Sequence, residues 1–381
     1  MKLLCMETNN KTYQCAIIGG GLAGLCLAIQ LADKGVSVIL FEKNKYPFHK
    51  VCGEYISMES WNFLTELGLP LTDLNLPKID ELGISSENGF MLNSKLPLGG
   101  FGISRYSLDN YLYELAKKKN VIIFDTCKVF DVQNIKDVYQ INTSNGIYNA
   151  VIICGTYGKY APAFVKDEEI KKQNKLNYIG VKYHIKTKLN ASRIELHNFK
   201  DGYCGISKID NDTYCLCYLS SSKNLQECGN DINKMEETIL YKNPFLKKYF
   251  TESEFLFNAP LVISNVTFQK KNTYKNSFFL AGDAAGSITP LCGNGMSMAM
   301  RASKLLTNLL VDYFNEIISK EELIKQYDLI WNKNFNTRIK TGYYLQYLFG
   351  KKHTTHFTLK MLHKLPSLTK KLISLTHGQS F

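Results

Sequence analysis

The first part of the chain follows the pattern of a strand, an apolar helix and a second strand. Tyr13 to Ile18 is a short run of strand-forming residues, and Val36 to Phe41 is continuously apolar. Between them, apolar residues recur at helical spacing from Leu25 to Ala32 and stop at Lys34-Gly35, a basic residue followed by glycine. Continuous apolar strands around such a helix are typical of parallel strands buried on both faces. The pattern therefore predicts a βαβ unit.

The pattern changes twice further along the chain. Lys128 to Thr143 alternates in polarity like a hairpin, and residues 178–219 are rich in strand-forming and aromatic side chains. Turn signals stand within this second region at Asp201-Gly202 and Asn211-Asp212. After Gly295, apolar residues recur at helical spacing almost to the last residue. The sequence thus predicts a β-rich middle and a helical C-terminal part.

A glycine-rich turn joins the first strand to the first helix. Gly19-Gly20-Gly21-Leu22-Ala23-Gly24 has the spacing of a dinucleotide-binding turn. In such a turn the first glycine allows the tight bend, the second admits a diphosphate, and the third lets helix and strand pack closely. Glu42 ends the second strand, where a carboxylate can accept hydrogen bonds from ribose hydroxyls. Together they predict a nucleotide site, but this motif alone does not distinguish FAD from NAD.

Cysteine usage and apolar runs point to a reduced compartment. The 11 cysteines contain no CxxC pair, and Cys15, Cys26 and Cys154 stand in apolar contexts where a free thiol behaves as a small hydrophobic group. Met1 to Thr12 is too short and polar for a secretory signal. The apolar run from Ala16 to Ala32 is interrupted by glycines and Gln30. We expect a cytoplasmic protein, either free or peripheral to a membrane.

The positive charge is concentrated near the C-terminus. The chain of 381 residues has a net charge of +12, and residues 331–381 carry nine Lys and Arg residues but no Asp or Glu. This segment is either a solvated basic face or a surface for an anionic partner, such as a membrane or a carrier protein. Nucleic acid is not expected, because nothing in the segment resembles a nucleic-acid-reading motif.

A second candidate cofactor segment lies near residue 283. The strand-like run Phe278 to Ala281 precedes Gly282-Asp283-Ala284-Ala285-Gly286, and Pro290 to Met296 then forms a glycine-rich turn before a helix. With the first glycine motif, these segments resemble the glutathione-reductase-like superfamily of FAD-dependent oxidoreductases. The resemblance is closest to the branch of geranylgeranyl reductase-type and para-hydroxybenzoate hydroxylase-type enzymes. It covers residues 13–303, with a weak gap across the middle.

The resemblance implies FAD as the cofactor and NAD(P)H as its transient reductant. Asp283 would hold a ribityl hydroxyl, and N–H groups around Gly295 and Met296 would stabilise negative charge on the reduced flavin. No metal site is expected, since His353-x-x-His356 lies among lysines without a third ligand nearby. The residues expected to contact FAD are Gly19, Gly21, Ala23, Gly24, Glu42, Lys43, Arg105, Val129, Gly282, Asp283, Gly293, Gly295 and Met296.

Two further segments strengthen the resemblance. Lys50-Val51-Cys52-Gly53-Glu54 is similar to a Cys-Gly-Glu turn of the geranylgeranyl reductase-like group. Arg105-x-x-Leu108-Asp109 is similar to a helix start whose arginine reaches the cofactor, and Ser107 is expected to open the helix. Cys52 and Glu54 are the candidate catalytic residues, although Cys52 also suits a tight turn and Glu54 also suits a helix cap. One departure is Cys154 to Gly158, where the family's usual glycine turn is only partly present.

The expected fold class is α/β: a Rossmann-like FAD-binding domain with a β-rich substrate domain inserted and a C-terminal helical segment. The FAD-binding domain comprises residues 1–77, 100–165 and 266–330, and the substrate domain comprises residues 78–99 and 166–265. Residues 331–381 form a basic helical tail, which Pro366 divides into two helices.

The favoured function is an FAD-dependent, NAD(P)H-dependent monooxygenase that hydroxylates a lipophilic or aromatic small molecule. One alternative is a geranylgeranyl reductase-like enzyme that delivers hydride to a C=C bond. Another is a flavin electron-transfer or binding protein without substrate chemistry. Tyr203, Tyr214 and Tyr218 are candidates for the lining of an apolar pocket in the β-rich region.

Overall fold

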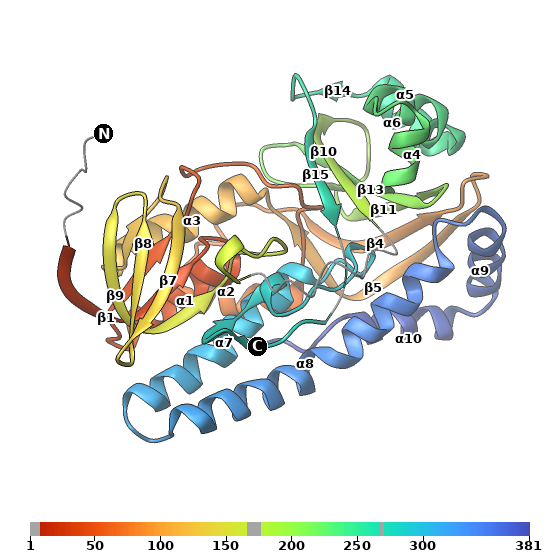
Figure 1. Cartoon of the computed structure of the whole chain (residues 1–381). Coiled ribbons are helices and arrows are strands. Elements are labelled where there is room, and N and C mark those ends of the chain that lie inside the picture. Colours follow the sequence, from red (N-terminus) through yellow and green to blue (C-terminus); the bar gives the residue numbers. More distant parts are fainter. Residues whose placement is uncertain (1–7, 166–176, 267, 269) are drawn as a thin grey trace, which may run out of the picture.

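The computed structural model describes residues 8–165, 177–266, 268 and 270–381, and it shows two sheets with helices around them (Figure 1). The domain limits that the sequence predicts at residues 1 and 166 lie outside the described residues. The α/β fold class expected from the sequence is confirmed, with a Rossmann-like nucleotide-binding part and helices at the C-terminal end.

The first sheet contains the βαβ unit. β1 lies between β2 and β9 and pairs in parallel with both. β2 also pairs in parallel with β6, and β9 pairs in parallel with β17. A hairpin of β7 and β8 joins the sheet at β9. The strands are β1 (Thr8–Ile18), β2 (Val38–Phe41), β6 (Ile122–Phe124), β7 (Val129–Ile135), β8 (Val138–Thr143), β9 (Gly146–Gly155), β16 (Tyr274–Lys275) and β17 (Phe278–Leu280).

Helices that pack around this sheet include α1 (Leu22–Asp33), α3 (Arg105–Lys118) and α7 (Gly295–Phe314), and α1 contacts both α3 and α7. Helix α3 begins two residues before the predicted Ser107. The reason is a cap: Ser104 is the N-cap residue, and its Oγ accepts the Ser107 N–H at 3.1 Å. The side chains of α1 are almost all buried, as expected for a helix between a sheet and other helices.

The second sheet is the β-rich part of the fold. Its order is β14-β10-β13-β12-β11-β4-β5-β3, with β15 also paired to β10. Asp201, Asn211 and Asp212 adopt positive φ values in the predicted turns. The strands are β3 (Tyr55–Ser57), β4 (Lys78–Ser85), β5 (Met91–Gly102), β10 (Tyr178–Lys186), β11 (Arg193–Phe199), β12 (Gly202–Lys208), β13 (Tyr214–Ser221), β14 (Glu254–Phe255) and β15 (Leu261–Val266).

Helices cover one face of the second sheet, and the sequence pattern did not predict them. α4 (Ser222–Glu227), α5 (Ile232–Thr238) and α6 (Pro244–Glu252) follow β13. Tyr218 and Tyr214 lie in the apolar cluster between this face and the helices. The opposite face is turned toward the first sheet's loops, and Tyr203 lies there, packed against Leu291.

Three helices end the chain: α8 (Lys320–Leu348), α9 (Lys352–Lys364) and α10 (Pro366–Thr376). The predicted break at Pro366 is confirmed. Helix α8 runs antiparallel to α7 and continues through residue 331 without interruption, and Trp331 is buried in the core of the first sheet (Figure 1). α9 and α10 pack on β5 of the second sheet. No helix in the described part of the chain is long and apolar enough to cross a membrane.

Candidate FAD-binding and active site

The glycine-rich turn between β1 and α1 leaves no space for side chains at two of its glycines. Gly19 has a φ of +109°, and a Cβ at Gly24 would lie 2.1 Å from the Gly19 carbonyl oxygen. Gly21 is the N-cap residue of α1 and has no side-chain cap, so the first N–H groups of the helix are available for an anion. Ala23, in the first turn, packs beside Gly282.

Glu42 lies beside this turn, as the sequence predicts. It is buried, and its Oε2 accepts the Gly20 N–H at 2.9 Å. Its Oε1 accepts the N–H and the side-chain amide of Asn44 at 2.9 and 2.8 Å. The Glu42 carbonyl oxygen accepts the Cys127 N–H, which brings β7 and its buried first residue, Val129, to the same strand end. Lys43 is exposed there.

Two cations face the middle glycine. A Cβ at Gly21 would have the Lys50 Nζ at 3.7 Å and the Arg105 guanidinium at 3.9 Å as its nearest neighbours. Both cations bind the buried Asp109: Arg105 donates twice at 2.7 Å and Lys50 once at 2.9 Å. Burial alone would raise the pKa of Asp109, but Arg105 and Lys50 outweigh it and hold that pKa below its usual value. Lys50 is a candidate phosphate ligand that the sequence interpretation missed.

The segment around Asp283 lies where β17 ends. Gly282 has a φ of +64°, and a Cβ there would approach Ala23 at 3.1 Å and Ala299 at 3.5 Å. The strand end, the start of α1 and the second turn of α7 therefore meet at this glycine. Asp283 is partly exposed, and its carboxylate forms no hydrogen bond or ion pair with any described residue. It is free to accept bonds from the hydroxyls of a ligand.

Unpaired buried polar atoms gather at the start of α7. Asn294 Oδ1 and Ser297 Oγ are buried and have no hydrogen-bond partner among the described residues, and the same holds for the Tyr55 hydroxyl. The Tyr55 ring packs beside Gly293, where a Cβ would be 3.1 Å away. Buried polar groups without partners are rare, and a ligand is one reason for them. The Cys52 Sγ lies 3.6 Å from the sulfur of Met296 in the first turn of α7.

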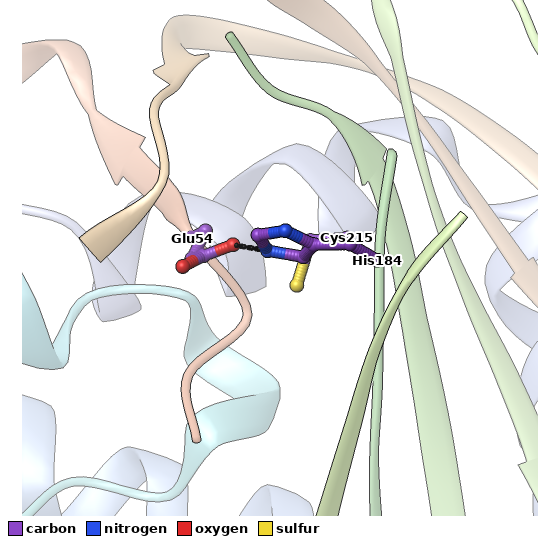
Figure 2. Close-up of side chains that lie close together, drawn as sticks. All are labelled: Glu54, His184 and Cys215. Carbon is purple, nitrogen blue, oxygen red and sulfur yellow. Dashed lines mark hydrogen bonds and ion pairs between the residues drawn. The ribbon is translucent and has the colours of Figure 1, made fainter. Parts of the chain in front are cut away.

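A buried charge cluster holds the turn that carries the two candidate catalytic residues. Glu54 has a φ of +56°, and its side chain is fully buried. Its Oε1 accepts from Lys182 Nζ at 2.5 Å and from the Arg105 N–H at 2.7 Å. Its Oε2 lies 2.6 Å from His184 Nε2 (Figure 2). Lys182 and His184 come from β10, and neither was singled out from the sequence.

The charges in this cluster are fixed by mutual contact. Burial alone would raise the pKa of Glu54, but His184 and Lys182 outweigh it and lower that pKa. Burial alone would lower the pKa of Lys182, but Cys215 and Glu54 outweigh it and raise that pKa. Glu54 and Lys182 are therefore a charged pair, which bridges the Cys52 turn and the second sheet.

The same cluster contains the atoms that come nearest to a metal site among the described residues. Glu54, His184 and Cys215 each offer one ligand atom, and these atoms lie within 4.8 Å of one another (Figure 2). The Lys182 ammonium, however, already supplies the positive charge next to Glu54. The carboxylate–histidine contact of 2.6 Å is a hydrogen bond, and burial raises the pKa of the Cys215 thiol. These contacts describe a proton-bearing cluster better than a metal centre.

The predicted cofactor residues fit FAD in their backbone constraints and in their charges. Glu42 binds the turn at Gly20, Arg105 lies beside Gly21, and Gly282 lies beside Ala23, so these predicted residues gather around the start of α1. Lys50 and Arg105 supply positive charge beside the turn that would hold a diphosphate. Glu54 and Lys182 are 128 residues apart in the sequence, so no local sequence pattern predicts that they form a pair.

Sequence comparison relates the chain to known flavoproteins. A family model described as an NAD(P)-binding Rossmann-like domain matches residues 17–51. Conditioned medium factor receptor 1 of Dictyostelium discoideum is 26% identical over 85% of this chain and 68% of its own. Digeranylgeranylglycerophospholipid reductase of Methanococcus vannielii is 19% identical, and the match covers 86% of this chain and 84% of the reductase. The FAD-dependent monooxygenase janM of Penicillium janthinellum is 23% identical, and the match covers 78% of this chain and 68% of janM.

Solved structures show the same fold. The flavin-dependent brominase Bmp2 superposes with a TM-score of 0.80 at 16% identity, covering 96% of this chain and 93% of its own. The sequence relatives confirm the predicted resemblance to FAD-dependent oxidoreductases, while the individual contacts of Glu42 and Asp283 with FAD stay predictions. Over most of its length the chain is similar to FAD-dependent monooxygenases and to a geranylgeranyl reductase-type enzyme, which supports its assignment to the FAD-dependent oxidoreductases.

Proposed function

We propose that this enzyme is an FAD-dependent monooxygenase that uses NAD(P)H and O₂ to hydroxylate a lipophilic or aromatic small molecule. FAD bound along the glycine turn and α7 would supply the redox chemistry. The proposal is supported by relatives named as monooxygenases: the FAD-dependent monooxygenase janM and kynurenine 3-monooxygenase of Dictyostelium discoideum.

The observation that carries the proposal is a buried face of the second sheet that combines apolar side chains with unpaired hydroxyls. Ser207 pairs with Cys215, and Cys215 pairs with His184, so these three side chains share one face. Tyr203 belongs to the same face and packs on Leu291, which precedes the α7 turn. The Ser207 hydroxyl is buried and unpaired in the described structure, as is that of Tyr55. Such a surface suits an apolar substrate with a few polar groups.

The residues of the turn have separate roles in this proposal. The first N–H groups of α7 and the helix dipole would stabilise negative charge at the flavin. Cys52, next to Met296, would contact the reacting region directly. Glu54 would act through the turn, since its oxygens are occupied by Lys182, His184 and the Arg105 N–H. We therefore assign Glu54 a positioning role and keep Cys52 as the catalytic candidate.

The alternative is hydride transfer to a C=C bond of a prenyl chain. It is favoured by the Cys-Gly-Glu turn, and one relative is named as a digeranylgeranylglycerophospholipid reductase. An electron-transfer protein without substrate chemistry would need neither the apolar face nor its unpaired hydroxyls.

Turnover with isotopically labelled O₂ separates these functions. The purified protein should retain FAD through gel filtration, oxidise NADH or NADPH, and place one labelled oxygen atom in an aromatic product. Reduction of a prenyl double bond under anaerobic conditions, with no oxygenated product in air, would replace the monooxygenase by the reductase. A protein that remains colourless after incubation with FAD would refute both.

We also propose that the C-terminal helices bring the site to an anionic membrane surface. α9 is buried along Thr355, Leu359 and Leu362, but Phe357 and Met361 form an exposed apolar stripe on another side of the helix. Phe357 is 71% exposed, and Tyr344 near the end of α8 is 69% exposed.

Exposed lysines accompany this apolar stripe, and residues 331–381 contain no acidic residue. An apolar stripe with lysines beside it is the pattern of a helix that lies in a lipid interface. Each lysine near an anionic surface contributes about 1 kcal/mol. The lysines are Lys351, Lys352, Lys360 and Lys364.

A further inference from the structure

We propose that Lys182 is a positioning residue for FAD, although it belongs to the second sheet and lies on the far side of the Cys52 turn. It would act through a closed ring of hydrogen bonds that links β10 to the cations beside Gly21. The proposal rests on the proposed FAD site and adds a residue that no nucleotide-binding motif contains.

The ring has five members, and each contact is direct. Lys182 Nζ donates to Glu54 Oε1 at 2.5 Å and to the Lys50 carbonyl oxygen at 3.2 Å. The Lys50 ammonium donates to Asp109 at 2.9 Å. Arg105 binds Asp109 through its guanidinium and Glu54 through its backbone N–H, at 2.7 Å in each case. The ring therefore closes without a gap.

Burial makes this ring rigid. The side chains of Lys182, Glu54 and Asp109 are fully buried, while Arg105 is 12% and Lys50 is 25% exposed. Only the two cations at the Gly21 side therefore have access to a ligand. A change at Lys182 would leave the Glu54 carboxylate without its cationic partner, and Glu54 directly holds the N–H of Arg105. The disturbance would reach the diphosphate site through one residue.

The net charge of the ring also supports a role in FAD binding. Lys50, Arg105 and Lys182 are positive, and Asp109 and Glu54 are negative, so the ring carries one net positive charge toward an anionic diphosphate. Replacement of Lys182 by methionine makes the ring neutral. The neighbouring His184, which is bound to Glu54, does not contact Asp109 or Lys50 in the described structure.

The FAD dissociation constant of Lys182→Met tests the proposal without requiring activity. We expect FAD binding to weaken at least about fivefold, the lower end of typical coupling between sites. Glu195→Gln is the matched control. Glu195 is a buried carboxylate of the same sheet, bound to Arg193 at 2.6 Å and His197 at 3.1 Å, but it is outside the ring. The control should bind FAD within about twofold of the parent.

A second variant tests the route of the effect. If Lys182 acts through Glu54, the single variant Glu54→Gln and the double variant Glu54→Gln/Lys182→Met should both bind FAD as weakly as Lys182→Met alone. FAD should also slow hydrogen exchange in β10 of the parent protein, and this protection should be lost in Lys182→Met. A merely structural role would not produce that loss.

Three results would overturn the inference. The first is that Lys182→Met binds FAD within twofold of the parent affinity. The second is that the losses of FAD affinity add up in the double variant. The third is that FAD still protects β10 from hydrogen exchange in Lys182→Met. If Lys182→Met does not fold, the double variant alone decides, because parental FAD affinity in it excludes the ring. A parent protein that binds no FAD would refute the proposed function instead, so the two failures are distinguishable.

Discussion

Glu236 is a single carboxylate whose protonation is shifted by its surroundings. It belongs to α5, and its Oε1 accepts hydrogen bonds from the hydroxyls of Tyr183 at 2.9 Å and Tyr218 at 2.7 Å. Burial raises its pKa from 4.5 to about 7, although the two tyrosines act in the opposite direction. The protonated form is therefore favoured in the folded protein up to a pH of about 7.

A raised folded-state pKa makes this residue a source of pH-dependent stability. Its contribution is fully present below pH 4.5 and is lost as the pH rises to about 7, because the unfolded chain ionises first. The total is about 3 kcal/mol, at about 1.4 kcal/mol per pKa unit. Glu236→Gln should remove this dependence. Unfolding free energies of both proteins from about pH 4 to pH 8 measure it. A constant difference between the two curves would contradict the prediction.

Asp283 is predicted to bind the cofactor directly. Asp283→Ala should raise the FAD dissociation constant, since a hydrogen bond to a charged group contributes about 1.5–3 kcal/mol. Asp312→Ala, at the other end of α7, is the control and should leave the affinity unchanged. Fluorescence titration with FAD measures both. Equal affinities in the two variants would show that the second cofactor segment has been misplaced.

The site residues that could be predicted from the sequence are those whose role depends on neighbouring positions in the chain. Gly19 and Gly24 are identified by spacing because a side chain at either would collide with neighbouring backbone. Glu42 follows from its position at a strand end. Lys182 could not be found in this way, because a lysine within a strand of buried residues has meaning only once Glu54 is placed beside it.

At the scale of elements, α9 carries the exposed apolar stripe on which the proposed membrane contact rests. Phe357→Ser/Met361→Ser should reduce co-sedimentation with anionic vesicles, because these side chains form the exposed stripe. Lys360→Gln/Lys364→Gln should reduce it more at low salt than at high salt. The control is Leu329→Ser, which removes an apolar side chain that is 63% exposed in α8, outside the stripe.

Two outcomes of the vesicle experiment would contradict the proposed anionic membrane surface. Parent protein that sediments equally with neutral and anionic vesicles would exclude a preference for an anionic surface, and parent protein that sediments with neither would exclude membrane binding. Retention on an acidic carrier protein, with no vesicle binding, would assign the same lysines to a protein partner. The full chain is used in every arm, because truncation before Trp331 would cut α8 and expose the core.

The elements themselves were predictable to different degrees. The strands of the βαβ unit and the C-terminal helices follow from the spacing of their apolar residues, because this spacing is regular over their length. α4, α5 and α6 are short, and their apolar residues serve a sheet face that only the fold defines. The start of α3 shifted to Arg105 because a serine three positions earlier than the predicted one caps the helix.

At the scale of the whole molecule, α8 joins the two sheets. Its first half lies in the core of the first sheet through Trp331 and Phe335, and its end leads to α9 and α10 on β5. Arg338 fixes its middle by binding the fully buried Glu59 at 3.2 Å, with Arg301 at 3.8 Å from the same oxygen. The predicted domain limit at residue 331 would fall within this helix.

Arg338→Met should destabilise the protein by about 3–5 kcal/mol, because it removes the nearest partner of a buried carboxylate. Lys304→Met removes a partly exposed ion pair with Glu66 and should cost no more than about 1 kcal/mol. Chemical denaturation of the two variants measures the contrast. Similar losses in both would mean that Arg301 alone satisfies Glu59.

The ring around Glu54 has a consequence for engineering. Exchange of residues 178–266 for the substrate region of another flavoenzyme is an obvious route to new specificity, since β10 to β15 form a continuous segment. Such a chimera would also exchange Lys182 and His184, while their partners in residues 50–54 would stay behind. A graft that includes both segments would keep the ion pair intact. The natural unit of recombination in this protein is therefore a pair of distant segments.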